Sequence, residues 1–330
     1  MIWTLTKSAK SPRANNPGHL TTEEVFREAL DRGIDEVAKQ KFAEPSIGET
    51  LVRVKRVKRD EGRVMALRPF SGVIPVNSDA DTPEFATSGL GFSWSWRTYT
   101  FRRFIGFERK SIEIDDIGFT KGSQSDLLDM HKRTVEYVIA DHFNRAFGLS
   151  GAPRLADDGC YYIDNDRPNP NPEAGRWSNR EATADLTIDT LFTAVLNAQR
   201  QVSPDGNLYP QTVKKLMIPP AWQKKLWVIL ESENVPGSNY NDANWARGVF
   251  SHKDVIVYPY LEINAIFYWL CEPSSEDNEL LLLIRRDPEV MTEWGLTGNP
   301  DVLVQRLRAD WGLGLGSPRK SIRGGLLEAS

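Results

Sequence analysis

Few residues in this chain have the types and spacing that catalysis would need. Asp115 and Asp116 are adjacent carboxylates, and paired carboxylates can act as general acid and general base. On a strand, however, neighbouring side chains point to opposite faces, so these two would be kept apart unless the chain bends. A solvated strand end explains the pair better than an active site does.

The histidines and cysteines form no pattern typical of a metal site. His131 and His142 lie on one predicted helix, but about 16 Å of helical rise separates them. Cys160 and Cys271 belong to no CxxC pair, which disfavours both a disulfide scaffold and a zinc ribbon. We therefore expect no metal and no cofactor.

The segment GLGSPRKS at 314–321 has the glycines and the lysine of a phosphate-binding loop, but not their spacing. The glycine that should precede Lys320 is missing, and too few residues follow to build a nucleotide-binding fold. We expect no nucleotide site there.

Composition is that of an ordinary globular protein. The chain has 330 residues, of which 40% are hydrophobic and 26% charged. No apolar run reaches the roughly 18 residues that a membrane span needs, and the start lacks the pattern of a signal peptide. The net charge of -4 argues against a protein that coats nucleic acid over its whole surface, but it allows a local basic face. We expect a protein made and used in a cytoplasm, with no membrane partner.

Helical periodicity predicts four main helices. The capping box formed by Thr21 and Glu24 starts one at 22–42, and that formed by Ser123 and Asp126 starts the longest, at 124–147. Thr187 caps a third at 188–201. The fourth follows Pro219 and Pro220 after a short strand at 216–218.

Strand patterns dominate residues 50–116. LVRVKRV and RVMALRPF flank the turn KRDEG, so we expect a hairpin there with Gly62 in the turn. A long alternating strand at 92–114 then completes an extended hairpin around a polar tip, and this hairpin would need a partner to cover it. Further strands are expected within 255–270 and 279–286, and the remaining segments are predicted to be irregular: the loops 150–185 and 232–252, and a glycine-rich, basic tail after Gly312.

Basic residues gather in two places. Lys55, Arg56, Lys58 and Arg59 lie around the first predicted turn. Five more follow the long strand among aromatic residues: Arg97, Arg102, Arg103, Arg109 and Lys110. They could bind a nucleic acid backbone, pair with a neighbouring subunit, or simply protect a strand edge. The contact with a neighbouring subunit is favoured because the hairpin cannot cover itself.

Several segments, in order, resemble the major capsid protein of tailed bacteriophages, and in detail the Mu-like major head subunit family. They are YTFRRFIGFERKSIEIDD (99–116), CYYIDNDRPNP with GRWSNR (160–180), ADLTIDTLFTAVLNAQ (184–199), DGNLYPQTVKKLMIPPAWQKKLWVILES (205–232), SNYNDAN (238–244) and DVIVYPYL (254–261). The resemblance covers about 90–270 well and the two ends loosely.

The resemblance implies an α+β fold, the phage major capsid fold. Its parts would be an N-terminal arm and first helix (1–59), an extended β-hairpin or E-loop (60–108), a peripheral domain with the spine helix 124–147 (109–204), an axial domain (205–262), and a return to the peripheral domain with a C-terminal tail (263–330). Three asparagines of the loop facing the capsomer axis would join the five basic residues in subunit contacts: Asn239, Asn241 and Asn244.

The function implied is self-assembly into hexamers and pentamers of an icosahedral virion shell enclosing double-stranded DNA, without sequence-specific contacts and without catalysis. Assembly would take place in the host cytoplasm. A separate scaffold protein, a portal and an optional decoration protein would be its partners. Two alternatives remain open: an encapsulin-type shell that encloses enzyme cargo, and a polymer-acting hydrolase that uses Asp115 or Asp116 beside a tryptophan-lined groove.

Overall fold

The computed structural model describes residues 46–68, 89–113, 119–149, 154–183, 185–204, 206–235, 243–261, 266–270, 278–295 and 300–326. The predicted helix at 22–42, the tip of the extended hairpin, Asp115, Asp116 and Cys271 lie outside the described residues.

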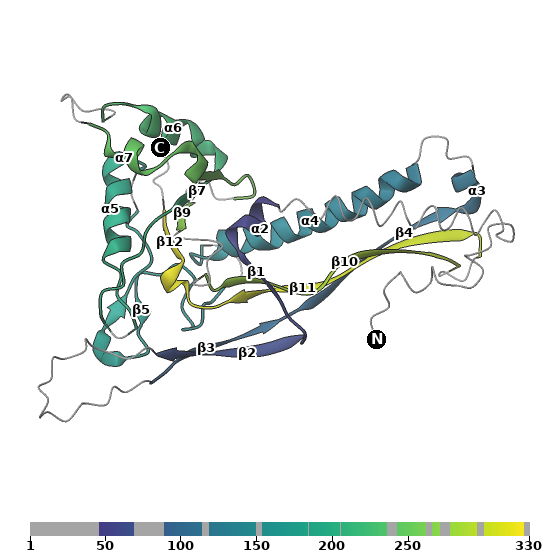
Figure 1. The fold of residues 1–330 in the computed structure, drawn as a ribbon, viewed down its shortest axis with the longest axis horizontal. Helices are drawn as coiled ribbons and strands as arrows, with labels where there is room; N and C mark the ends of the chain where they lie inside the picture. The colour runs from purple at the N-terminus through teal and green to yellow at the C-terminus, as the bar shows by residue number, and fades with distance from the viewer. Residues whose placement is uncertain are drawn as a thin grey trace, which may run out of the picture. The chain divides into compact units, whose positions relative to one another are not determined.

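The described chain is a mixed α+β structure, as predicted (Figure 1). Its α-helices are α2 (Ile47–Leu51), α3 (Arg109–Glu113), α4 (Phe119–Arg145), α5 (Ile188–Gln199), α6 (Gln223–Glu231) and α7 (Trp245–Val249). Its strands are β1 (Arg53–Arg56), β2 (Glu61–Arg68), β3 (Gly89–Arg97), β4 (Tyr99–Glu108), β5 (Arg167–Pro168), β6 (Arg176–Trp177), β7 (Lys215–Ile218), β8 (Val255–Val257), β9 (Ile266–Leu270), β10 (Leu280–Trp294), β11 (Val302–Leu315) and β12 (Ile322–Leu326). Short 3-10 turns are η4 (Pro172–Ala174), η5 (Pro220–Trp222), η6 (His252–Asp254) and η7 (Pro318–Lys320).

The strands form two four-stranded sheets and two two-stranded ribbons. One sheet has the order β1-β10-β11-β4, and the other has the order β12-β9-β7-β8. The ribbons are β2-β3 and β5-β6. In the second sheet β12 and β9 are antiparallel, whereas β7 and β8 are parallel.

Chain contacts divide the protein into two compact units. Of the described residues, the first contains 100–113, 119–132, 287–295 and 300–309, and the second contains the others. In the first unit, apolar residues of α4, β10 and β11 form a core: Leu127, Leu128, Val290, Leu303 and Leu307.

The second unit has the larger core, built from α5, α6, α7 and the strand β7. Helix α5 begins as predicted, because the Thr187 side chain accepts a hydrogen bond from the backbone N–H of Thr190. Its buried face carries Leu191, Ala194 and Ala198. Helix α6 follows the two prolines and buries Leu226, Ile229 and Leu230, also as predicted.

The first predicted hairpin is wrong. β1 pairs in parallel with β10, and β2 pairs with β3, so the segments on either side of KRDEG do not pair with each other. Gly62 lies in β2 opposite Trp96, where a Cβ atom would come within 2.5 Å of the indole ring. Gly62 is needed for space beside a tryptophan and not for a turn. The predicted strand 92–114 is likewise two strands, β3 and β4, followed by the helix α3.

Two further predictions need correction. Helix α4 begins at Phe119, so Ser123 is not the residue that starts the helix but lies inside it, where its hydroxyl donates to Oε1 of Gln305 at 2.9 Å. The segment after Gly312 is no tail, because it supplies the end of β11, the turn η7 and the strand β12.

Candidate subunit-contact surfaces

The ribbon β2-β3 is the extended hairpin that the sequence predicted. Its two strands run side by side and lead toward the undescribed tip (Figure 1). Val64, Met65 and Leu90 are exposed on it, with Leu90 at 66% of its full accessible surface. A two-stranded ribbon is marginally stable by itself in water, so exposed apolar side chains here indicate a surface that another molecule covers.

The base of the hairpin is packed firmly against its own unit. Trp94 is only 7% exposed and belongs to a small core with Leu281 and Leu283 of β10. Gly312 in β11 makes room for the bend between β3 and β4, because a Cβ atom there would lie 2.2 Å from the carbonyl oxygen of Arg97. The base of the hairpin is therefore held in place by packing within the second unit.

A polar cluster fixes the same bend. Thr98 donates its backbone N–H to the carbonyl oxygen of Asp60 at 2.7 Å. Arg285 in turn places Nη1 2.9 Å from Oδ1 of Asp60 and 3.2 Å from Oδ2 of Asp310. Because Asp310 is 1% exposed, the carboxylate end of its ion pair with Arg285 is shielded from water. These bonds connect the base of the hairpin, where β2 begins and β3 ends, to the strands β10 and β11.

The five basic residues predicted as subunit contacts are placed in different surroundings. Arg97 is exposed and lies over the ring of Tyr99 at 6.0 Å, and Arg102 and Arg103 are exposed on β4. Arg109 is held within the first unit, 3.8 Å from Asp301 and 5.4 Å from the ring centroid of Trp294. Lys110 is exposed on α3. Contact with a neighbouring subunit stays a prediction for all five.

Of the three asparagines, Asn239 and Asn241 lie outside the described residues. Asn244 is only 7% exposed: its Oδ1 caps α7 by accepting from the N–H of Ala246 at 3.0 Å, and its Nδ2 donates to the carbonyl oxygens of Ile229 and Ser232. These hydrogen bonds hold the amide group of Asn244 within the chain. Contact with a neighbouring subunit stays a prediction for all three asparagines.

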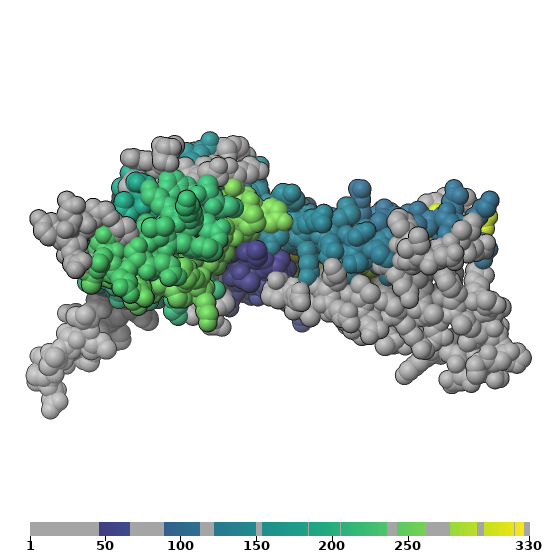
Figure 2. Space-filling view, turned by 90° about the horizontal axis from the view of Figure 1, so that it is seen from above, coloured from purple at the N-terminus to yellow at the C-terminus, as the bar shows by residue number. Residues whose placement is uncertain are grey.

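A second uncovered apolar surface lies on α6 and α7. Trp227, Val228 and Val249 are each about half exposed, with exposed fractions of 46%, 52% and 54%. His252 packs edge-on against Trp227 and bonds to the carboxylate of Glu231. These two helices lie in the green region that faces the viewer in Figure 2. Aromatic residues with a polar rim are typical of the centre of a protein interface.

The WSNR segment is held by the end of the chain, which the sequence did not indicate. The guanidinium groups of Arg167 and Arg319 both lie over the ring of Trp177, at 4.9 and 4.1 Å from its centroid. Arg323 donates from Nε to Glu181 at 2.6 Å and from Nη1 to the carbonyl oxygen of Ser178 at 3.0 Å. The sequence does show two arginines four residues apart, Arg319 and Arg323, near the last strand. Their partners are more than a hundred positions away, so the sequence alone does not identify them.

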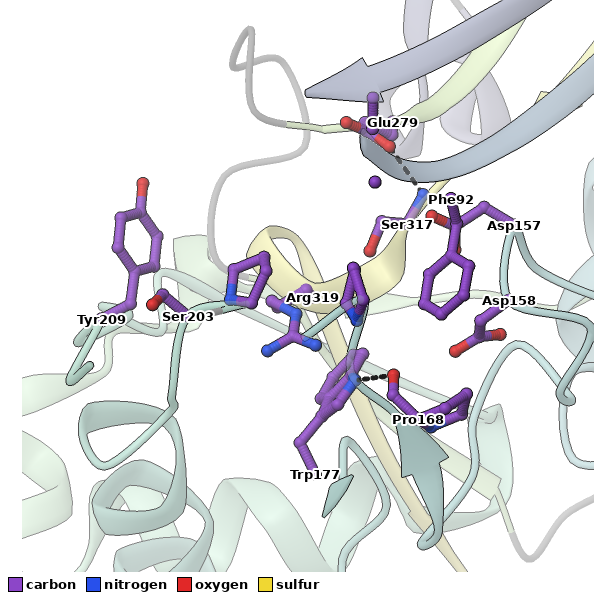
Figure 3. A pocket seen from close by; sticks show the side chains of 14 residues that line it. Phe92, Asp157, Asp158, Pro168, Trp177, Ser203, Tyr209, Glu279, Ser317 and Arg319 are labelled. Carbon is purple, nitrogen blue, oxygen red and sulfur yellow. Dashed lines mark hydrogen bonds between the residues drawn. The ribbon is translucent and has the colours of Figure 1, made fainter. Parts of the chain in front are cut away.

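A pocket of about 400 Å³ lies beside this cluster (Figure 3). Phe92 of the hairpin, Trp177, Tyr209 and several prolines give it an apolar lining, and carboxylates and Arg319 add charge. Burial, with Asp158 and Glu279 nearby, raises the pKa of Asp157 to about 6. Asp158 is paired with the buried Arg167 at 2.8 Å, and Glu279 accepts from the N–H of Ser317 at 2.6 Å.

The lining of this pocket includes hydroxyl groups and the carboxylates of Asp157, Asp158 and Glu279, but no histidine, cysteine or lysine. Across the described ranges, no group of three or more His, Cys, Asp or Glu is placed to hold a metal ion. No described helix is both long and apolar enough to cross a membrane.

Comparisons with known proteins place the chain by its fold. No protein-family profile and no curated protein sequence matches it. Among solved structures it is similar to a chain of Microbacterium phage Oxtober96, with 13% identity, a TM-score of 0.52, and coverage of 86% of this chain and 92% of that one. It is also similar to the acid-stable capsid structure of Helicobacter pylori bacteriophage KHP30, with 11% identity, a TM-score of 0.51, and coverage of 84% and 87%. The protein therefore has an α+β fold that is also found in a phage capsid chain.

Proposed function

We propose that this chain is the major capsid subunit of a tailed bacteriophage, and that it assembles into hexamers and pentamers of an icosahedral shell around double-stranded DNA. The observation that carries the proposal is the similarity to the KHP30 capsid structure, which extends over 84% of this chain. In this proposal the role of the chain is structural.

Two uncovered apolar surfaces support self-assembly. The hairpin exposes Met65 and Leu90, and the helices α6 and α7 expose Trp227 and Val249. A closed ring of identical subunits needs two different complementary surfaces on each copy. We propose that the hairpin and the α6–α7 face are such surfaces, with Arg97, Arg102, Arg103, Arg109 and Lys110 forming polar contacts to the neighbouring subunit.

The finer assignments follow from the segments that resemble the Mu-like major head subunit. They assign the spine helix to α4 and an axial domain to 205–262. The other domain boundaries are those proposed from the sequence. A separate scaffold protein, a portal, an optional decoration protein, assembly in the host cytoplasm and residence in the virion belong to the same proposal.

The decisive experiment is to purify the full chain and examine it by size-exclusion chromatography and negative-stain microscopy. We expect capsomers or closed shells. A protein that stays monomeric at every concentration would contradict the proposal. If shells form in cells that also carry the other head genes, the nucleic acid inside them distinguishes a phage head from a compartment that stores enzymes.

The hairpin surface is tested with Met65→Glu and Leu90→Glu together. These charges should prevent assembly while leaving the fold intact, because both side chains are exposed in the single chain. The matched control is Met65→Leu with Leu90→Met, which keeps the surface apolar and should assemble normally. Normal shells from the double glutamate variant would show that this face is not a contact.

A further inference from the structure

A compact group of cationic side chains lies at the end of β1 and in the turn that follows it. Lys55, Lys58 and Arg59 are all exposed. None of the three has an ion-pair partner in the described part of the chain. Arg53 and Arg56 lie in the same stretch but take part in other interactions, so they are left out of the argument.

One of the two acids next to this group is already in an ion pair. Asp60 is bound to Arg285 at 2.9 Å and accepts from Thr98. Glu61 lies opposite Arg97 in the register of β2 and β3. The turn therefore carries a local surplus of positive charge on a chain whose net charge is -4.

Protection of a strand edge does not explain the whole group. Among the described strands β10 is the one neighbour of β1, so β1 lies at an edge of this part of the sheet, and Lys55 on β1 could serve to block stray pairing. Lys58 and Arg59, however, lie beyond the end of β1, in a bend that offers no row of unpaired backbone groups. Their charge needs a different explanation.

The surroundings favour a polyanion over a protein partner. The bend at 58–60 has no apolar side chain, and Val57 before it packs toward Trp94 in the core. A protein interface usually has an apolar centre, and the bend itself supplies none, although Val54 on β1 is 48% exposed. Cationic groups on flexible stems suit phosphate groups, which need charge and little defined geometry.

We propose that the turn from Lys55 to Arg59 is a contact for the phosphate backbone of double-stranded DNA in the assembled shell. This inference rests on the proposed function and names the surface that would contact the packaged DNA. Fully extended, the five residues span no more than about 18 Å, enough to reach two or three phosphates of one strand. Contacts of this kind do not depend on the base sequence.

The test uses the full-length protein with Lys55→Gln, Lys58→Gln and Arg59→Gln combined. Binding of unassembled protein to a short fluorescent DNA duplex is measured by anisotropy over a range of salt concentrations. We expect the Kd at low salt to rise at least about tenfold, and the slope of log K against log salt to fall by about 2 to 3. A single Lys58→Gln variant, which should lower the slope by about 1, covers the case in which the triple variant does not fold.

The matched control removes the same charge elsewhere in the same unit. Arg133→Gln, Arg200→Gln and Lys253→Gln change three other exposed cations and should leave the slope within about 1 of the original. An equal loss in both triple variants, or an unchanged slope in the turn variant, would overturn the proposal. So would a turn variant that fails to assemble while it binds DNA normally, because the turn would then contact a neighbouring copy.

The same measurements separate this inference from the proposed function. If the unchanged protein never forms particles but its DNA binding depends on the turn, the capsid proposal fails and the DNA contact stands. If particles form normally and the turn has no effect on the salt slope, the DNA contact fails and the capsid proposal stands.

Discussion

Acid should destabilise this protein through one buried histidine. His142 is 0% exposed, and no hydrogen-bond partner is found for either of its ring nitrogens. Its ring packs edge-on against Tyr162 at 4.5 Å. Burial, followed by the nearby positive charge of Arg154, lowers the pKa of His142 from 6.5 to about 3.

The sign follows from the proton count. Between pH 6.5 and 3 the unfolded chain binds a proton at His142 and the folded chain does not, so stability falls as the pH falls through this window. The full loss corresponds to about 5 kcal/mol, and the loss between pH 6.5 and pH 5 to about 2 kcal/mol. His131, whose pKa burial lowers to about 4, adds a loss of the same sign, whereas the raised pKa of Asp157 acts in the opposite direction.

The assay therefore compares variants and does not rely on the total pH dependence of the unfolding free energy. Urea unfolding of the original protein and of His142→Phe is followed by tryptophan fluorescence at pH 7 and pH 5. The difference in unfolding free energy between the two proteins should change by about 2 kcal/mol between these pH values, with the variant less sensitive to acid. The exposed His252 supplies the control His252→Gln, to which the burial argument does not apply. Equal pH dependence in His142→Phe and the original protein would refute the reasoning.

Three other changes test the packing that positions the contact surfaces. Trp94→Ala removes the indole that packs on Leu281 and Leu283 and should cost about 3 to 5 kcal/mol, measured by urea unfolding; a loss below about 1 kcal/mol would mean that the hairpin base is not packed as described. Gly312→Ala forces a Cβ against the backbone oxygen of Arg97 and should cost about 1 to 3 kcal/mol. By contrast Gly248→Ala, with no atom within 4 Å of the new methyl group, should be neutral or stabilising, and equal thermal shifts in the two variants would count against the tight bend. The buried Glu136 accepts from Tyr258 at 2.6 Å and from Gly48 at 2.8 Å, so a double-mutant cycle of Glu136→Gln and Tyr258→Phe should show a coupling of about 1 to 3 kcal/mol, and additive effects would disprove the direct bond.

Local patterns were sufficient where an element depends on its own sequence. The threonine cap placed the start of α5 correctly, and the two prolines placed α6. The start of α4 was misplaced because Ser123 has the sequence of a cap but bonds to Gln305, far away in the chain. A side chain that can serve two roles cannot be assigned from its neighbours in sequence alone.

Strand pairing was the main failure, and the cause is sequence distance. β1 and β2 are separated by one short turn, which favoured a hairpin, yet β1 pairs with β10 more than two hundred residues later. The pairing of β2 with β3 was predicted correctly because strand alternation is a local feature, whereas the length of the second strand was not. Asn244 shows the same limit, because its place in a predicted loop did not indicate that its side chain caps α7 and is buried.

The placement of arginines separates the residues that fold this chain from those that would assemble it. Arg167, Arg319 and Arg323 are buried, and each donates hydrogen bonds to acceptors within the second unit. A buried guanidinium that loses its partner lowers the stability of the folded state. These residues therefore favour one arrangement of the 158–181 segment and the final strand. Arg97, Arg102 and Arg103 are exposed, and an exposed charge contributes little to the stability of a single chain. Substitutions in the first group should therefore lower the amount of soluble protein, whereas substitutions in the second should leave it soluble and change how the copies associate.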